Sequence, residues 1–342
     1  MNRQFPPEVI QLIVEASLDR YDLFDYYHSD PKLRYATLKS YSLLNSTWCG
    51  ASQAELVKRV ELHTQDSAKK FLGLAERRGG TLGGVKDMFV NSRSSSITTS
   101  TLAKLLRCVP QVINLRVYCG SVDIYDLAQL QQLRSLELDR CIIDGSPSTS
   151  LLRLPQLRRL EITGCRVEDS ALHFLTPAFL PQLRRVDVDA LDIIAPLIQQ
   201  LEIVSSNSYD VDYAILARAE SLLLLPLPLY VERLDMFSKL PSLPRFLHIN
   251  VIQYYSNRDY QKATVAAMEA LLETKKPGLQ VILLNDCGID DSIKSLIQRF
   301  EERGVRVQLV DEQLDFEGAI VEMEEIRFEE KRAAEAAVIG VY

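Results

Sequence analysis

The chain has 342 residues, of which 47% are hydrophobic and 25% are charged, so it can bury the core of one large or two smaller globular domains. Its net charge of −7 argues against a nucleic-acid partner, because proteins that bind the phosphate backbone carry basic surfaces. No apolar run reaches the roughly 20 residues of a membrane helix, and Glu8 and Glu15 interrupt the apolar segment that a secretion signal needs. We therefore expect a cytoplasmic and/or nuclear protein that works away from membranes.

Residues 1–62 predict a small helical region. Pro7 suits the first turn of a helix, Glu8 suits the positive end of its dipole, and apolar residues follow with helical spacing. Polar residues from 19 to 32 end this helix, and a second helical stretch carries the apolar side chains of residues 38–56. Two or three short helices cannot hide all of this apolar surface from water, so we expect a partner to cover part of it.

An internal repeat covers residues 63–310. The segments Leu133–Cys141 and Leu157–Cys165 share the template LxxLxLxxC, and their starts lie 24 residues apart. The segment Leu279–Cys287 repeats the full form far downstream, and shortened, shifted or weaker copies lie at Val112–Cys119, Leu183–Asp189, 85–90, 198–203, 221–225 and 245–249. Helix-like stretches separate the copies, so each unit is expected to be a strand followed by a helix.

Alternation within the template predicts a strand that is buried on one face. Leu136 and Leu138 alternate with Ser135, Glu137 and Asp139, which is the two-residue period of a strand. One such unit cannot bury its own apolar face, whereas stacked units share a continuous core. We expect the core ladder to consist of Leu136, Leu138, Leu160, Ile162, Val186 and Val188.

The cysteine of each template falls where the chain turns away from its strand. A cysteine is small enough for such a turn and carries a weak S–H donor. Because Cys119, Cys141 and Cys165 recur with the repeat, we expect them to stack in a column as reduced thiols that pack the turns. Metal ligands usually converge at short local spacings, which these cysteines lack, so we expect no metal.

The repeat zone resembles the cysteine-containing subtype of the leucine-rich-repeat family. The resemblance rests on Cys165-Arg-Val-Glu-Asp-Ser-Ala-Leu-His-Phe-Leu and Cys287-Gly-Ile-Asp-Asp-Ser-Ile-Lys-Ser-Leu-Ile, which share a cysteine, apolar and acidic positions and an amphipathic helix. It implies an α/β fold in which residues 63–310 form a solenoid, with parallel strands on the concave face and helices on the convex face. Residues 311–342 carry no repeat, so they form either a terminal helix that covers the last repeat or a frayed tail, and of the two we favour an acidic, partly helical tail.

Residues 1–62 resemble the F-box, the short helical motif that binds the Skp-type adaptor of cullin–RING ubiquitin ligases. Phe5-Pro6-Pro7-Glu8-Val9-Ile10 looks like its opening Leu-Pro-Pro-Glu-Ile-Ile, and Tyr41-Ser-Leu-Leu-Asn-Ser-Thr-Trp48 looks like its second-helix segment. Phe5 in place of leucine and a linker of roughly 17 residues between the helices depart from the motif. The resemblance implies an adaptor-binding patch made of Pro7, Ile10, Ile13, Leu38, Leu44 and Trp48.

Two functions fit this domain order. In the first, the chain is the substrate-recognition subunit of a Skp–cullin–F-box ubiquitin ligase, with the F-box helices docked on the adaptor and the repeats bound to an unknown protein substrate. In the second, it is a non-catalytic interaction scaffold whose F-box-like helices only cap the first repeat. Neither function needs an enzyme site. The four histidines have no nucleophile or base at a suitable spacing, and the glycine-rich stretch 77–86 lacks the ending of a phosphate-binding loop, so we expect no catalytic residues and no cofactor.

An acidic residue recurs between the last two apolar positions of four successive units, at Glu137, Glu161, Asp187 and Glu202. Strands stack ~4.8 Å apart, so these carboxylates should form one column, in which neighbours repel by about 0.9 kcal/mol even in water. One interpretation is a solvated face that Arg159 and Arg185 partly neutralise. The other is a substrate-binding stripe for a basic segment of the protein substrate.

Overall fold

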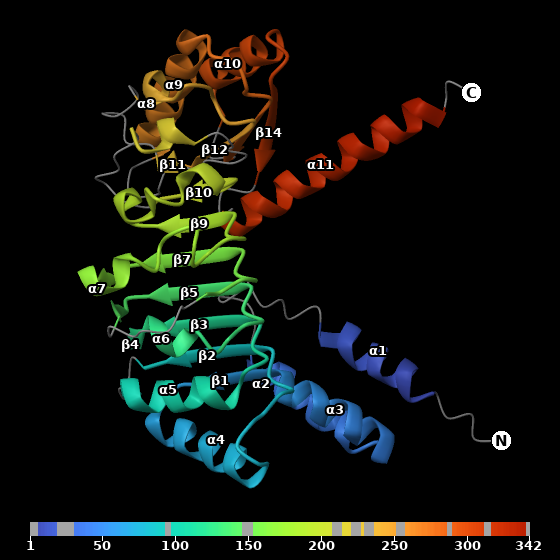
Figure 1. Ribbon diagram of the computed structural model, residues 1–342. Helices are drawn as coiled ribbons and strands as arrows, with labels where there is room; N and C mark the ends of the chain where they lie inside the picture. Colours follow the sequence, from blue (N-terminus) through green and yellow to red (C-terminus); the bar gives the residue numbers. More distant parts are fainter. Residues whose placement is uncertain are drawn as a thin grey trace, which may run out of the picture. The chain divides into compact units, whose positions relative to one another are not determined.

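The computed structural model describes residues 6–18, 31–92, 97–145, 153–206, 214–219, 227–228, 236–250, 257–285, 289–310 and 316–339. The chain folds into two compact units, the first made of Met1–Leu157 with Gly164–Phe174, the second of Arg158–Thr163 with Leu175–Tyr342. Parallel strands joined by helices and turns make up most of both units (Figure 1). This arrangement confirms the expected mixed α/β class with parallel strands.

Three helices open the first unit: α1 (Pro7–Leu18), α2 (Pro31–Ser42) and α3 (Ser46–Lys58). The sequence predicted one helical stretch through residues 38–56, but the chain breaks between α2 and α3. The break occurs because the Asn45 side chain accepts hydrogen bonds from the backbone N–H groups of Thr47 and Trp48, at 2.9 and 3.2 Å, and caps α3. The helices share a small core in which Ile10, Val14 and Leu38 are buried against Tyr41, Trp48, Ala51 and Leu56.

The rest of the first unit is an array of parallel strands ordered β1-β2-β3-β5, beside a row of shorter parallel strands ordered β4-β6-β8. The strands are β1 (Arg59–Leu62), β2 (Asp87–Asn91), β3 (Asn114–Tyr118), β4 (Ser121–Asp123), β5 (Ser135–Asp139), β6 (Ile142–Asp144) and β8 (Arg166–Val167). The helices are α4 (Gln65–Arg77), α5 (Thr99–Cys108), α6 (Ile124–Leu127) and α7 (Asp169–Leu172).

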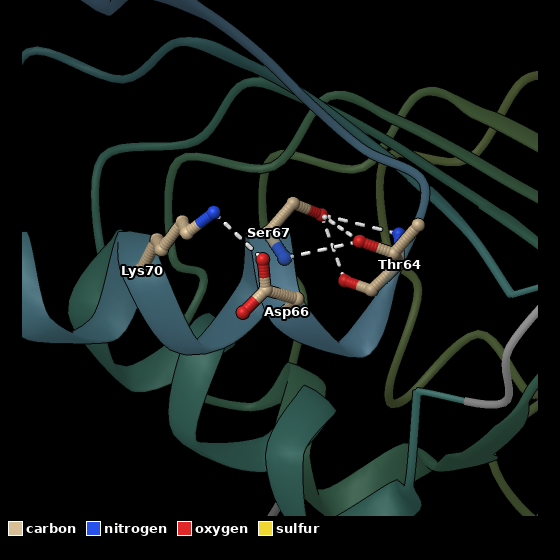
Figure 2. Close-up of polar contacts among 4 residues, drawn as sticks. All are labelled: Thr64, Asp66, Ser67 and Lys70. Atoms are coloured by element: carbon tan, nitrogen blue, oxygen red, sulfur yellow. Dashed lines mark hydrogen bonds and ion pairs between the residues drawn. The ribbon is translucent and has the colours of Figure 1, made fainter.

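Helix α4 begins at a capping box just after the first strand (Figure 2). The Ser67 N–H donates to Thr64 Oγ1 at 3.1 Å, and the Thr64 N–H donates to Ser67 Oγ at 3.1 Å. Lys70 pairs with Asp66 at 2.7 Å one turn later, but both groups are exposed and this pair contributes little to stability. Helix α5 also begins at a side-chain cap, because the Thr98 side chain accepts a hydrogen bond of 3.3 Å from the Thr101 N–H.

The second unit contains parallel strands in the order β7-β9-β10 and a sheet in the order β11-β12-β13-β14. The strands are β7 (Arg159–Thr163), β9 (Arg185–Val188), β10 (Ile203–Ser205), β11 (Leu227–Pro228), β12 (Phe246–Asn250), β13 (Val281–Asn285) and β14 (Arg306–Val310). The connections include three 3-10 helices, Leu191–Ile194, Ile198–Gln200 and Leu216–Arg218, and the helices α8 (Met236–Lys239), α9 (Asn257–Thr274) and α10 (Asp291–Glu301). The chain ends in the long helix α11 (Phe316–Ile339).

The predicted core residues are confirmed. Leu136, Leu138, Leu160, Val186 and Val188 are fully buried, and Ile162 is nearly so. Within the second unit the register pairs Leu160 with Val186 and Ile162 with Val188, as the repeat predicted. The weaker copies 85–90 and 245–249 also coincide with strands, β2 and β12, whereas copy 221–225 lies outside the described residues.

The turn after each strand corrects the predicted cysteine column. Cys119, Arg140 and Gly164 directly follow β3, β5 and β7, and all three have a left-handed backbone with φ of 57°, 53° and 60°. The template cysteines, Cys141 and Cys165, occupy the next position. Cys119 is therefore one residue out of step with them, and Gly120 stands where the column would continue. The shortened copy 112–119 misled the alignment because it lacks one residue before its cysteine.

Candidate functional site

The six residues predicted to face an adaptor divide into two groups. Ile10 and Leu38 are buried in the core of α1–α3, so their side chains hold the helices together instead of facing a partner. Pro7, Ile13 and Leu44 are exposed, and Trp48 is half-buried with its ring centroid 5.3 Å from that of Tyr41. The helices bury Ile10 because it lies one turn from Val14, on the same stripe of α1.

Sequence reasoning missed two strongly exposed apolar residues. Leu12 is 63% exposed and Leu43 is 79% exposed. Leu12 and Ile13 follow Val9 by three and four residues, so these three form an outward stripe beside the buried one. The helical period could have separated the two stripes. The break at Asn45 could not be located so easily, and it is what places Leu43 and Leu44 at an exposed corner between α2 and α3.

Glu137 does not belong to an acidic column in the first unit. The register places it beside Arg116 of β3, and the two side chains form an ion pair. Phe89 of β2 lies on the other side of Arg116, and Glu61 of β1 lies beside Phe89. The outward row of this unit therefore consists of two acidic residues, one aromatic residue and one basic residue: Glu61, Glu137, Phe89 and Arg116.

The register of the second unit corrects the position of Glu202. Ser205, not Glu202, lies beside Asp187, because β10 starts only at Ile203. Glu202 precedes the strand and approaches Arg184 at 3.7 Å. Glu161 does lie beside Asp187, as predicted, but its carboxylate pairs with Arg159 at 2.9 Å. These contacts favour the interpretation of a face balanced by arginines over that of an acidic stripe.

Asp187 is an unusual member of this face because it is only 6% exposed. Burial, together with the negative charge of Glu161, raises the pKa of Asp187 to about 7, although a hydrogen bond from Ser205 and the charge of Arg159 oppose the shift. Among the described residues, no group donates a hydrogen bond to its Oδ1 atom. Asp187 is therefore a buried polar residue, and its side chain is not accessible to a substrate.

Helix α11 packs within the second unit, so the structure favours a terminal helix over a frayed tail for residues 316–339. Met323 and Ile326 of α11 are buried in one cluster with Ile203, Phe246, Val281, Leu283 and Val310. Ion pairs join Glu324 to Arg185, Glu330 to Arg245 and Glu329 to Arg306, the last at 3.7 Å. The sequence signal for this contact was the pair of apolar residues three positions apart in an acidic segment.

Two of the histidines and two of the cysteines form contacts within the fold. The buried His248 shares a hydrogen bond of 2.7 Å with Asn285, and His173 shares one of 3.0 Å with Tyr125. The Cys165 thiol donates a hydrogen bond of 3.1 Å to the Leu138 carbonyl. Two main causes raise the pKa of Cys165: the larger is its hydrogen bond with Cys141, and the smaller is burial. In the part of the chain that the structure describes, which omits Cys287, no group of three or more potential ligands could hold a metal ion, and no helix is long and apolar enough to cross a membrane.

Comparison with known proteins gives little more. No family model matches the chain, and no curated protein matches its sequence. Among solved structures, an internalin (inlF) from Listeria monocytogenes is similar over 68% of this chain and 77% of its own chain, with 16% sequence identity and a TM-score of 0.30. A similarity this low carries no argument about function, so the assignment rests on the strands, helices and side chains described above.

Proposed function

We propose that the chain is a non-catalytic recognition subunit of a Skp–cullin–F-box-type ubiquitin ligase, in which α1–α3 bind the adaptor and the repeats bind the protein substrate. The observation that carries the proposal is the apolar surface of α1 and of the corner between α2 and α3. This surface lies on the segment whose sequence resembles the F-box.

The adaptor-binding patch proposed here consists of the exposed apolar residues Leu12, Ile13, Leu43 and Leu44, with Pro7 at the start of α1. Monomeric proteins rarely leave several large apolar side chains exposed together, so such a group favours a protein interface. Gln11 donates a hydrogen bond of 2.7 Å to Glu55, which joins α1 to α3 and holds the exposed stripe of α1 in place.

The repeats would supply the substrate-binding surface through mixed charges. Glu137 and Glu161 remain candidate contacts, and each is paired with an arginine. A substrate with both acidic and basic groups fits such a surface better than a uniformly basic segment does. In this function the chain performs no bond chemistry. It raises the effective concentration of substrate lysines near a conjugating enzyme that the ligase recruits.

The scaffold alternative is supported by a separate observation. Helix α3 ends at Lys58 and β1 begins at Arg59, with no loop between them. The Lys58 carbonyl also accepts a hydrogen bond of 2.8 Å from the Lys86 N–H, just before β2. The helices thus continue directly into the first strand of the array, as a terminal cap of a repeat protein would.

Co-purification with the Skp-type adaptor tests the proposal. We expect the double variant Leu12→Asp, Leu44→Asp to weaken adaptor binding at least tenfold, because the interface would have to desolvate unpaired charges. Gln53→Asp on an exposed position of α3 is the matched control and should bind like the wild type. Ile10→Asp is unsuitable, because a charge in the helical core would unfold the region.

Adaptor retention by the double variant at the wild-type level would show that the docking proposal is wrong. The scaffold alternative predicts that neither the wild type nor the double variant binds the adaptor. It also predicts that removal of residues 1–45 lowers the midpoint of thermal unfolding of the repeats.

A further inference from the structure

The face of the second unit beneath α11 has the composition of a helix-binding site. Ile203, Phe246, Val281, Leu283 and Val310 are all buried in one apolar cluster, which we call the covered face. They come from β10, β12, β13 and β14, so the covered face extends across several strands. Alternation along β12 and β13 directs Leu247, Ile249, Ile282 and Leu284 to the opposite face.

Arginines border the covered face. Arg185, Arg245 and Arg306 each pair with a glutamate of α11: Glu324, Glu330 and Glu329 respectively. Gln308 adds a hydrogen bond of 2.9 Å to Glu322. The charges of the border thus complement an acidic helix, which is the opposite of the basic partner that an acidic stripe would require.

We infer that the covered face is a binding site for an acidic amphipathic helix, that α11 fills this site within the chain, and that a partner protein engages it by inserting a helix of the same kind. The partner helix would present two apolar residues three positions apart, flanked by glutamates, as Met323 and Ile326 are in α11. This inference does not depend on adaptor binding.

The contacts of α11 suit an exchangeable occupant. Of the α11 side chains that the structure describes, residues 321–332, only Met323 and Ile326 are buried, whereas Val321 and Phe328 are 54% and 62% exposed. The side chains of Glu324, Glu329 and Glu330 are between 43% and 68% exposed, and ion pairs this open to water are individually weak. These weak contacts suffice within the chain, because covalent attachment to the rest of the protein raises the effective concentration of α11 at the covered face to the order of millimolar.

A labelled peptide of residues 316–339 tests the inference by fluorescence anisotropy against the full-length chain. We expect the variant Met323→Asp, Ile326→Asp to bind the peptide at least tenfold more tightly than the wild type does, because its own α11 no longer occupies the site. Val321→Asp, Phe328→Asp is the matched control: it adds the same charge to exposed positions of the same helix and should bind like the wild type.

Charge exchange tests the specificity of the site. Arg245→Glu, introduced into the chain with the two α11 substitutions, should weaken peptide binding at least fivefold, and a peptide carrying Glu330→Arg should restore it. Circular dichroism shows whether the two aspartates in α11 prevent folding. If they do, Glu324→Lys with Glu330→Lys replaces them, because it removes two ion pairs of α11 without placing a charge in the apolar cluster.

Equal peptide affinity in the wild type, the opened variant and the control would overturn the inference, and so would a failure of the exchanged charges to restore binding. Sedimentation velocity adds a further outcome. If the opened variant or the wild type dimerises with micromolar affinity, the occupant in trans is α11 of a second copy, and the proposal of a different partner protein is wrong.

Discussion

Three strands of the first unit, β2, β3 and β5, differ from β10 and β13 of the second unit in how many of their faces are buried. In β2, β3 and β5 buried and half-buried residues alternate, whereas every residue of β10 and β13 is buried. The sequences differ in the same way: Asn-Leu-Arg-Val-Tyr in β3 alternates, and Val-Ile-Leu-Leu-Asn in β13 is almost continuously apolar. A strand with apolar residues on both faces therefore indicates a second covering element, which here is α11.

The polar residues of the two units differ accordingly. In the first unit, neighbouring strands balance each other's charges, as Arg116 and Glu137 do. In the second unit, arginines at the border of the covered face are balanced by glutamates of α11, far away in sequence.

The largest expected effect comes from matched phenylalanines on the two faces. Phe246 lies fully buried beneath α11, so Phe246→Ala should lower the free energy of unfolding by about 3–5 kcal/mol. Phe89 is only half-buried in β2, so Phe89→Ala should cost about 1 kcal/mol. Urea denaturation measures both values. Equal losses would contradict the difference in covering between the two units.

On the opposite, buried side of the strands, substitution of a core leucine by alanine should destabilise the two units by similar amounts. Leu136 in β5 and Leu160 in β7 are both fully buried and have the same place in the repeat. Leu136→Ala and Leu160→Ala should each cost roughly 2–5 kcal/mol, since each leaves a cavity in a closed core. Their unfolding midpoints in urea measure the effect, and a loss well below 1 kcal/mol for Leu160→Ala would mean that the strand register is wrong.

The smallest expected effect is the pH dependence caused by Asp187. Since its pKa is raised from 3.8 to about 7, the folded state binds a proton more readily than the unfolded state between about pH 4 and 7. Stability from this group is therefore greatest below about pH 4, falls as pH rises to about 7 and is level above it. Asp187→Asn removes this slope and should stabilise the protein at pH 8 by roughly 1–3 kcal/mol, less than the full pKa shift because the amide is also buried.

Ser205→Ala sharpens that experiment. The Ser205 hydrogen bond lowers the pKa of Asp187, so its removal should extend the decline in stability to higher pH. Urea denaturation of the three proteins from pH 5 to pH 9 provides the comparison. A wild-type slope that Asp187→Asn leaves unchanged would show that another group causes it.

Much of the fold could be predicted because its signals are local. The alternation around Leu136 and Leu138 identified the core face of β5, and the same pattern identified β7 and β9. Helix starts at Thr98 and at Thr64 follow from side chains that bond the next few backbone groups. The exposed stripe of α1 was also within reach, because helical spacing alone separates Leu12 from Ile10.

Other features were set by contacts between residues distant in sequence. Ser205 instead of Glu202 lies beside Asp187 because strand pairing, not the repeat template, fixes where β10 begins. The helical tail became part of the second core because Met323 and Ile326 met an apolar surface assembled from four strands.

The sequence by itself therefore determined the parallel α/β class, the core residues of the repeats and the helical character of the N-terminal region, because each depends on the spacing of residues close together in the chain. Only the tertiary structure decided which outward residues stay open, which acid is buried at Asp187 and which face α11 covers. Burial and charge pairing at those places arise from segments up to 139 residues apart, as in the pair of Arg185 with Glu324, and local periodicity carries no information about them.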